Sequence, residues 1–409
     1  MEDVLDRFLR YVKIDTQSEE NDRHPSTGKQ FVLAGLLAEE LKAMGASEVT
    51  LDEEFCYVYA VIPSNLPAEQ SAPCVGFLAH MDTSPAVSGA GVNPRIVRFT
   101  GEDIDLGGDG KYILSLRDFP QMKFLVGEEL VVTDGTTLLG ADDKAGVAEI
   151  MTMAETLLIH PEIPHGKLCL CFTPDEEVGG GTAKIDLHRF AADFGYTVDG
   201  GPLGGLEYEN FNAASARLTV HGRSIHPGSA KNTMRNALLM AMEFQSLLPA
   251  AQDPMYTEGY EGFYHLCALS GDVEKAQAEY ILRDHDKAKF AEKKAFFKAC
   301  ADFLDRKYGP GTCETEIRDS YYNMKELILP RMEIVDKAME AMEELGIKPL
   351  VSPIRGGTDG AMLTHMGVPC PNLCTGGGNC HGRFEYASVP QMRKVAELLV
   401  KIAEKHAQP

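Results

Sequence analysis

Apolar residues in the first third of the chain alternate between helical spacing and short continuous runs. Apolar residues three and four positions apart indicate a helix, whereas a short apolar run between turn residues indicates a buried strand. In chain order the pattern predicts a helix over 3–12, a helix over 27–44, a strand near Val49, and strands over 58–62 and 74–80. The second helix is preceded by Pro25-Ser26 and ended by Gly45, as is typical of helix boundaries. The nearly uniform apolar run over 74–80 is of the kind buried in parallel sheets.

After residue 84 this pattern gives way to a segment rich in Gly, Pro and Asp. Such composition predicts an extended loop-and-hairpin insertion over 84–135. Beyond it, a helix is predicted to follow the segment 140–146 and to continue through Glu149 and Leu157, and strands are predicted over 168–172 and 195–199. The alternation of helix and strand therefore continues, and it predicts an α/β domain.

The pattern changes again near Glu207. Alternating apolar and polar residues predict half-exposed antiparallel strands over 216–221 and 279–283, and amphipathic helices are predicted over about 235–248 and 286–306. From about Ile317 the α/β style resumes and ends in a helix over 390–406. We therefore predict an α/β domain, with a mixed sheet and helices on both faces, formed by residues 1–207 and 317–409. It is interrupted by a smaller α+β domain over 208–316.

Length and charge narrow the classes of function. A chain of 409 residues is long enough for two domains. Its formal net charge of −22 argues against nucleic acid or an anionic membrane as a partner, because both attract basic patches. The sequence has no apolar run of the length that spans a membrane and no apolar core of a signal peptide near its start. Its ten scattered cysteines do not form the pattern of a disulfide framework, so we predict reduced thiols and a cytoplasmic location.

Two adjacent acids, Glu176 and Glu177, follow the predicted strand over 168–172. Adjacent carboxylates repel each other, so a fold that holds both at the end of a buried strand is expected to supply positive charge nearby. A metal ion bound by one glutamate would supply that charge and leave the other free to move protons. The alternative is a solvated loop with two surface charges.

Other residues of the types that bind metals occupy strand ends and loops. His80 and Asp82 end an apolar strand and point to the same face, where the aspartate can fix the imidazole tautomer. Asp142 lies just before a predicted helix, Asp199 ends a strand, and His381 follows a Gly-rich loop. Taken singly, these residues could be a core histidine, a helix N-cap, an Asp-Gly turn and a flexible loop.

Two further alternatives concern the region around His381. The glycines before it could cradle a phosphate, but no Gly-Lys-Ser/Thr follows them. Cys370, Cys374 and Cys380 could form a structural zinc site with His381, but the paired C-x-x-C spacing is missing.

The combination carries more information than any single residue. His80, Asp142, Glu177, Asp199 and His381 supply two imidazoles and three carboxylates. Mixed sets of this kind suit zinc, manganese or cobalt rather than calcium. Five ligands are too many for one open catalytic zinc, but they fit two metal ions roughly 3.5–4 Å apart that share a bridging carboxylate. Glu176 would remain beside them as the general base.

Six segments carry a resemblance to a known family, and they occur in the expected order over essentially the whole chain. They are Gly76-Phe-Leu-Ala-His-Met-Asp-Thr-Ser-Pro, Thr136-Thr-Leu-Leu-Gly-Ala-Asp-Asp-Lys-Ala-Gly, Phe172-Thr-Pro-Asp-Glu-Glu-Val-Gly, Tyr196-Thr-Val-Asp-Gly-Gly, Arg355-Gly-Gly-Thr-Asp-Gly and Cys370-Pro-Asn-Leu-Cys-Thr-Gly-Gly. In these segments the chain resembles the tripeptide aminopeptidases of the di-zinc superfamily that includes aminoacylases and glutamate carboxypeptidases.

The resemblance implies a role for each residue of the group. His80 and Asp199 would bind one zinc ion, Glu177 and His381 the other, and Asp142 would bridge them. It also implies that Glu176 is the base, that Asp82 orients His80, and that the peptide between Asp142 and Asp143 is cis.

The same resemblance implies that the α+β insert is a lid domain with substrate-binding residues. His226 would approach the scissile carbonyl, and Arg283 and Arg355 would hold the carboxylate of the substrate. The alternatives are a His-Pro turn and two surface ion pairs.

We therefore predict a metallo-aminopeptidase that releases the N-terminal residue from tripeptides and holds two Zn²⁺ per subunit, with Mn²⁺ or Co²⁺ as alternatives. A dipeptidase, a carboxypeptidase and an N-acyl amino acid hydrolase are alternatives within the same superfamily. A metal-free binding protein on the same fold is an alternative of a different class. The expected partner is a small peptide, and the sequence leaves the oligomeric state open, with a homodimer among the options.

Overall fold

The computed structural model describes residues 2–408 and divides into two compact units. The first unit comprises the residues up to Tyr208, Leu327–Val351 and the residues from Thr358 on, and the second unit comprises Glu209–Glu326 and Ser352–Gly357. The chain thus enters the second unit twice, at residues 209–326 and again at 352–357, and returns to the first unit each time. No helix within residues 2–408 is both long and apolar enough to cross a bilayer.

The first unit is built on a mixed eight-stranded sheet with the strand order β1-β2-β8-β3-β9-β16-β10-β15. Its strands are β1 (Ser47–Leu51), β2 (Val58–Ile62), β3 (Val75–His80), β8 (Leu168–Thr173), β9 (Phe194–Val198), β10 (Gly205–Glu207), β15 (Leu350–Val351) and β16 (Asn372–Leu373). β3 pairs in parallel with both β8 and β9, whereas β2 pairs antiparallel with β1 and β8. Every residue of β3, β8 and β9 is buried, as the apolar runs predict.

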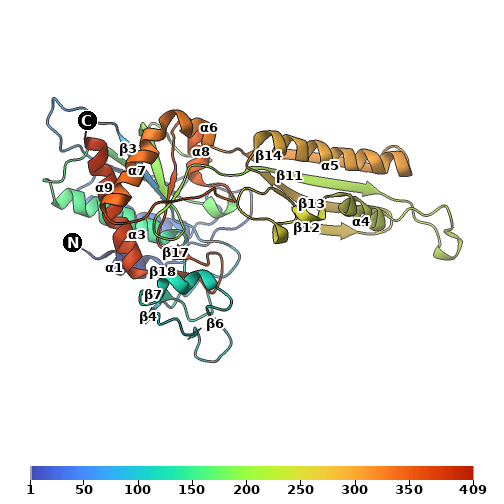
Figure 1. Cartoon of the computed structure of the whole chain (residues 1–409), viewed down its shortest axis with the longest axis horizontal. Helices are drawn as coiled ribbons and strands as arrows, with labels where there is room; N and C mark the ends of the chain where they lie inside the picture. Colours follow the sequence, from blue (N-terminus) through green and yellow to red (C-terminus); the bar gives the residue numbers. More distant parts are fainter. Residues whose placement is uncertain (1, 409) are drawn as a thin grey trace. The chain divides into compact units, whose positions relative to one another are not determined.

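Helices lie on both faces of this sheet. They are α1 (Val4–Tyr11), α2 (Gln30–Met44), α3 (Ala141–Ile159), α7 (Met332–Glu344), α8 (Asp359–His365) and α9 (Val389–Ala407). On one face Phe77 stacks on Tyr196, whose hydroxyl donates to a carbonyl of α7 and contacts His406 of α9. On the other face Leu78 packs in a cluster with Leu363 of α8. Figure 1 shows α3 beside α9. The predicted α/β class with a mixed sheet is confirmed.

The insertion over 84–135 folds into small sheets. One has the order β17-β18-β7-β4, from β4 (Arg95–Arg98), β7 (Glu129–Val132), β17 (Gly377–Gly378) and β18 (Tyr386–Ser388), and the other pairs β5 (Ile104–Asp105) with β6 (Ile113–Leu114). Phe99, Met122, Leu130 and Tyr386 share one apolar cluster. This cluster ties the insertion to the strands that flank residues 379–385, the loop that carries His381.

The second unit contains a four-stranded antiparallel sheet with the order β12-β13-β11-β14. Its elements are β11 (Asn212–His221), α4 (Ala237–Leu247), β12 (Phe263–Gly271), β13 (Lys275–Asp284), α5 (Lys287–Tyr308) and β14 (Cys313–Tyr321). Figure 1 shows α5 running along β14. The predicted end of the insert at residue 316 falls inside β14, because β14 pairs with β11 along its length and the unit extends to Glu326. Residues 352–357 also belong to this unit.

Short elements complete the chain. They are the helix α6 (Lys325–Ile328) and the 3₁₀ helices η1 (Pro120–Leu125), η2 (Glu176–Val178), η3 (Pro227–Ser229), η4 (Ala250–Gln252), η5 (Pro254–Tyr256) and η6 (Leu329–Arg331). Among these, η2 matters most for the candidate site, because it contains both adjacent glutamates.

Candidate metal centre

Three parallel strands deliver candidate ligands to one edge of the sheet in the first unit. His80 is the last residue of β3, Glu177 follows β8, and Asp199 follows β9. Because β3 lies between β8 and β9, their carboxyl ends meet, and this edge is where α/β sheets usually bind ligands. Asp142 reaches the same edge from the start of α3, and His381 reaches it from the loop between β17 and β18.

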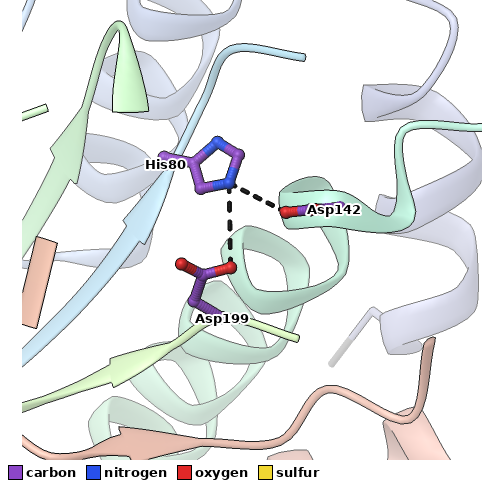
Figure 2. Close-up of side chains that lie close together, drawn as sticks. All are labelled: His80, Asp142 and Asp199. Atoms are coloured by element: carbon purple, nitrogen blue, oxygen red, sulfur yellow. Dashed lines mark hydrogen bonds and ion pairs between the residues drawn. The ribbon is translucent and has the colours of Figure 1, made fainter. Parts of the chain in front are cut away.

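His80 is nearly fully buried, and its two ring nitrogens have different neighbours. Nδ1 lies 3.0 Å from the carbonyl oxygen of Asp82 and 3.3 Å from its carboxylate. Nε2 lies 2.9 Å from Oδ1 of Asp142 and 3.7 Å from Oδ1 of Asp199 (Figure 2). When Nδ1 donates to Asp82, Nε2 faces the two aspartates, and once deprotonated it would direct its lone pair at a cation held between them.

Asp142 stands between the two imidazoles. Its Oδ1 faces His80, and its Oδ2 lies 3.1 Å from Nε2 of His381. Nε2 of His381 also lies 2.8 Å from Oε2 of Glu177. The ligand atoms therefore fall into two groups, each within 4.8 Å, namely His80–Asp142–Asp199 and Asp142–Glu177–His381. Asp142 is common to both groups, as a bridging carboxylate would be.

One unpartnered atom supports the fit of this site to a cation. Oε1 of Glu177 is buried and has no hydrogen-bond partner among residues 2–408. A buried carboxylate oxygen without a partner is costly unless a cation or a proton meets it. The mixed imidazole and carboxylate donors are those that zinc and neighbouring transition metals take.

The close packing of these groups shifts their pKa values in opposite directions. Burial raises the pKa of Asp199 to about 8, although the charge of His80 opposes the change. Burial alone would raise the pKa of Asp142, but hydrogen bonds from His381 and His80 outweigh it and lower that pKa. Hydrogen bonds to Asp142 and Glu177 raise the pKa of His381 to about 10. Three acids and two imidazoles thus compete for protons in one place.

Glu176 lies beside this group. Burial, together with the charge of Asp199, raises the pKa of its carboxyl well above the ordinary value. The backbone N–H groups of Glu176 and Glu177 donate to the two carboxylate oxygens of Asp82, at 3.0 and 3.2 Å. Asp82 therefore contacts both His80 and the backbone of η2, and it links the end of β3 to the loop after β8.

Two acids that sequence reasoning missed hold the ligand-bearing loops. Asp175 has a φ of 57°, and its carboxylate accepts hydrogen bonds from the N–H and hydroxyl of Ser26 and from the side chain of Gln30. Glu385 accepts hydrogen bonds from the backbone N–H groups of the turn that carries Asp142. The available signals were weak: Asp175 directly precedes the paired glutamates, and Glu385 lies four residues after His381.

The peptide bond between Asp142 and Asp143 is cis, as the resemblance implied. Asp143 belongs to neither ligand group; its carboxylate accepts hydrogen bonds from the backbone N–H of His80 and of Gly146. The cysteines considered for a structural zinc site are free thiols, and neither ligand group among residues 2–408 contains a cysteine.

The three predicted substrate-binding residues lie in the second unit. His226 is exposed, and its Nδ1 accepts the N–H of Gly228. Arg355 donates from its guanidinium to the backbone carbonyls of Gly259 and Glu261. Arg283 donates to the carbonyl of Arg355, which brings the two arginines together. Their contact with a substrate stays a prediction.

Comparison with known proteins places this geometry in context. The model of peptidase family M20/M25/M40 matches residues 131–405. Among curated relatives, peptidase T from Alkaliphilus oremlandii is 53% identical over 99% of both chains, and peptidase T from Clostridium acetobutylicum is 54% identical over the full length of both.

Solved structures share the fold. A tripeptidase from Staphylococcus aureus has a TM-score of 0.79 at 22% identity, with 99% of this chain and 98% of the other covered. An aminopeptidase from Bacillus cereus has a TM-score of 0.76 at 23% identity with the same coverage. A dinuclear metal-binding peptidase of family M20 from Bacillus subtilis has a TM-score of 0.65 at 13% identity, with 98% and 96% covered.

Proposed function

The chain belongs to peptidase family M20/M25/M40, and from this premise we propose that it is a metal-dependent aminopeptidase that releases the N-terminal residue from tripeptides. The observation that supports it most is the pair of ligand groups that share Asp142, with Glu176 beside them. The similarity over the full length to relatives called peptidase T, and the fold shared with a tripeptidase, support tripeptides as the substrate class.

In this proposal His80 and Asp199 hold one metal ion, Glu177 and His381 hold the other, and Asp142 bridges them. Bound at this site, two divalent ions would polarise the scissile carbonyl and lower the pKa of a water molecule between them. We propose zinc, because the donors mix imidazole and carboxylate, with manganese or cobalt as alternatives.

Glu176 is the proposed proton carrier. Its raised pKa suits a group that accepts a proton from water and then passes it to the nitrogen of the leaving amine. Asp82 assists in two ways: it keeps Nδ1 of His80 protonated, so that Nε2 is free to bind, and it holds the backbone of Glu176. Hydrogen bonds within the first unit support both proposed roles of Asp82.

The second unit is the proposed lid. Arg283 and Arg355 would hold the C-terminal carboxylate of the tripeptide, and His226 would stabilise the charge that develops on the scissile carbonyl oxygen. In the structure most donors of Arg355 bind backbone carbonyls, so Arg283 is the stronger candidate for the carboxylate. We also propose a cytoplasmic location, with which ten free thiols agree.

A substrate panel tests the proposal. Zinc-reconstituted protein is assayed with di-, tri- and tetrapeptides, N-acetyl amino acids and N-blocked tripeptides, and the metal content of the same sample is measured. We expect the highest kcat/KM for tripeptides with a free amino group and release of the N-terminal residue. Preference for dipeptides, for N-acetyl amino acids or for C-terminal release would favour one of the other family activities.

A metal-free binding protein on this fold is the alternative of a different class. It would need a missing ligand or a replaced base, whereas all five ligand candidates and Glu176 are present. Tripeptide binding without turnover by metal-loaded protein would favour this alternative.

Light scattering of the same sample separates a monomer from a homodimer.

A further inference from the structure

Glu385 accepts three backbone hydrogen bonds with one carboxylate. It directly precedes β18 and is 1% exposed. Its Oε2 accepts from the N–H groups of Leu139 and Gly140 at 2.8 and 2.7 Å, and its Oε1 accepts from the N–H of Asp142 at 2.9 Å. The buried carboxylate of Glu385 thus binds three backbone N–H groups of the turn that leads into Asp142, the proposed bridging residue.

The N–H groups that Glu385 binds lie at the start of α3. The first N–H groups of a helix have no partner within the helix, and an anion is favourable at this end. Gly140 has a φ of 82°, and Asp142 and Asp143 have non-helical backbone angles although they stand in the first turn of α3. Glu385 therefore supplies the partners that fix this irregular backbone. It does so from a segment more than two hundred residues away.

The side chain of Asp142 depends on that backbone. Its two oxygens face different imidazoles, with Oδ1 at 2.9 Å from His80 and Oδ2 at 3.1 Å from His381. A carboxylate can bridge two metal ions only when each oxygen points at its own ion. A rotation of the backbone at Asp142 would turn both oxygens together and weaken both positions.

We propose that Glu385 is a positioning residue for the metal centre, acting through the amides of Leu139, Gly140 and Asp142 to aim the Asp142 carboxylate at both metal positions. Glu385 contacts neither metal nor substrate in this role. The inference rests on the proposed function for the bridging role of Asp142. Groups that orient a metal ligand typically contribute 10- to 100-fold to metal affinity.

Two substitutions separate geometry from charge. Glu385→Gln keeps the shape but has a single acceptor oxygen, so its amide NH₂ must face either the N–H of Asp142 or those of Leu139 and Gly140. Glu385→Asp keeps the negative charge but is one methylene shorter. For both variants we expect zinc affinity to fall by about 10- to 100-fold, with the two ions lost together.

The measurement is zinc binding rather than peptidase activity. Metal-free protein is titrated with zinc against a chromogenic chelator, and the melting temperature is recorded with and without zinc. Glu128→Gln is the matched control, because Glu128 is a half-buried acid of the same unit that binds Ser388 and Gln391 but no amide of the Asp142 turn. We expect the control to bind two zinc ions as the wild type does.

Three results would overturn the inference. The first is normal zinc affinity in both Glu385 variants. The second is normal affinity in Glu385→Asp with a loss only in Glu385→Gln, because this result would indicate that the negative charge alone matters. The third is an equal loss of affinity in the control Glu128→Gln. A metal-free melting temperature near that of the wild type shows that each variant folds. If the wild type binds two zinc ions but cleaves no tripeptide, the proposed function fails while the role of Glu385 stands.

Discussion

Glu176 and Glu177 are neighbours in the chain but have different surroundings. Glu177 is hydrogen-bonded to His381, and its other oxygen is buried without a partner. Glu176 lies near Asp199, and burial raises the pKa of its carboxyl well above the ordinary value. Glu177 is therefore suited to hold a cation, and Glu176 is suited to carry a proton.

Glu176→Gln tests this division. We expect kcat for a tripeptide to fall by roughly 10²- to 10⁴-fold, the usual contribution of a general base, while the zinc content stays at the wild-type level. Steady-state kinetics and metal analysis of the same sample measure both quantities, and Glu54→Gln on an exposed loop serves as the control. Parallel loss of zinc and activity would make Glu176 a ligand rather than a base.

Residue type and position explain which site residues could be predicted. His80, Asp142, Glu177, Asp199 and His381 are of metal-binding types at strand ends or loops, and the structure brings them together. Asp175 and Glu385 could not be identified in the same way. Their carboxylates accept hydrogen bonds from backbone N–H groups and nearby side chains, partners that no local sequence pattern marks, so only the folded chain reveals them.

At the scale of elements, the loop after β8 is held by the segment that precedes α2. Asp175 accepts hydrogen bonds from Ser26 and Gln30, and His24 lies 3.2 Å away. Burial would raise the pKa of Asp175, but the hydrogen bonds from His24, Ser26 and Gln30 outweigh it and lower the pKa. The loop that carries Glu176 is thereby anchored on a second element.

Asp175→Asn should loosen this anchor. Asparagine lacks the second acceptor oxygen, so at least one buried donor loses its partner, and we expect the free energy of unfolding to fall by about 1–3 kcal/mol. We also expect kcat to fall more than KM changes, because Glu176 is displaced. Urea unfolding and steady-state kinetics check the two effects. Unchanged stability with unchanged kcat would show that the hydrogen bonds of Asp175 do not hold the loop.

The buried His406 of helix α9 leads us to expect that the stability of the protein depends on pH. Burial lowers the pKa of His406 to about 3, and its Nε2 faces the hydroxyl of Tyr196. In the unfolded chain the pKa of histidine is about 6.5. The unfolded state therefore binds the proton first as pH falls. The neutral imidazole of His406 makes its full contribution to the free energy of unfolding above pH 6.5, and this contribution is lost as pH falls from 6.5 to 3.

His406→Gln retains a donor for Tyr196 but does not titrate. Between pH 7.5 and 5.5 we expect the wild type to lose about 1 kcal/mol more stability than this variant. Urea unfolding of metal-free protein at both pH values gives the difference, and the exposed His160→Gln should behave as the wild type. Equal losses in the wild type and His406→Gln would contradict a buried neutral histidine.

Elements with a clear apolar pattern were predictable, and those without one were not. The strands β3, β8 and β9 are buried along their length, so their residues form apolar runs. In contrast, β14 alternates charged residues with half-buried ones and contains few apolar residues. It is a strand because it pairs with β11, and its own sequence pattern does not predict it. The predicted end of the insert failed at β14 for this reason.

At the scale of the whole molecule, the proposed function gives the second unit the task of binding the carboxylate of the substrate. Arg283 packs near the rings of Phe263 and Tyr321, and its Nε is buried without a hydrogen-bond partner among residues 2–408. A guanidinium with an unused donor has the chemistry to bind a carboxylate. We therefore propose that Arg283 would meet the C-terminal carboxylate of a tripeptide.

Arg283→Ala should raise KM for tripeptides with a free carboxylate by roughly 10- to 100-fold, the value of a charged hydrogen bond of about 1.5–3 kcal/mol. C-terminally amidated tripeptides should show little further loss. Arg217→Ala, an exposed arginine of the same unit, is the control variant. The same penalty for both substrate forms would remove Arg283 from carboxylate binding and leave it a structural role.

The central claim is that distant parts of the chain form one site for two metal ions bridged by Asp142. Anomalous diffraction at the zinc edge, on crystals of zinc-reconstituted protein, tests it most directly. We expect two peaks roughly 3.5–4 Å apart, one beside His80 and Asp199 and the other beside Glu177 and His381. A single peak, or two peaks that do not flank the carboxylate of Asp142, would contradict the claim.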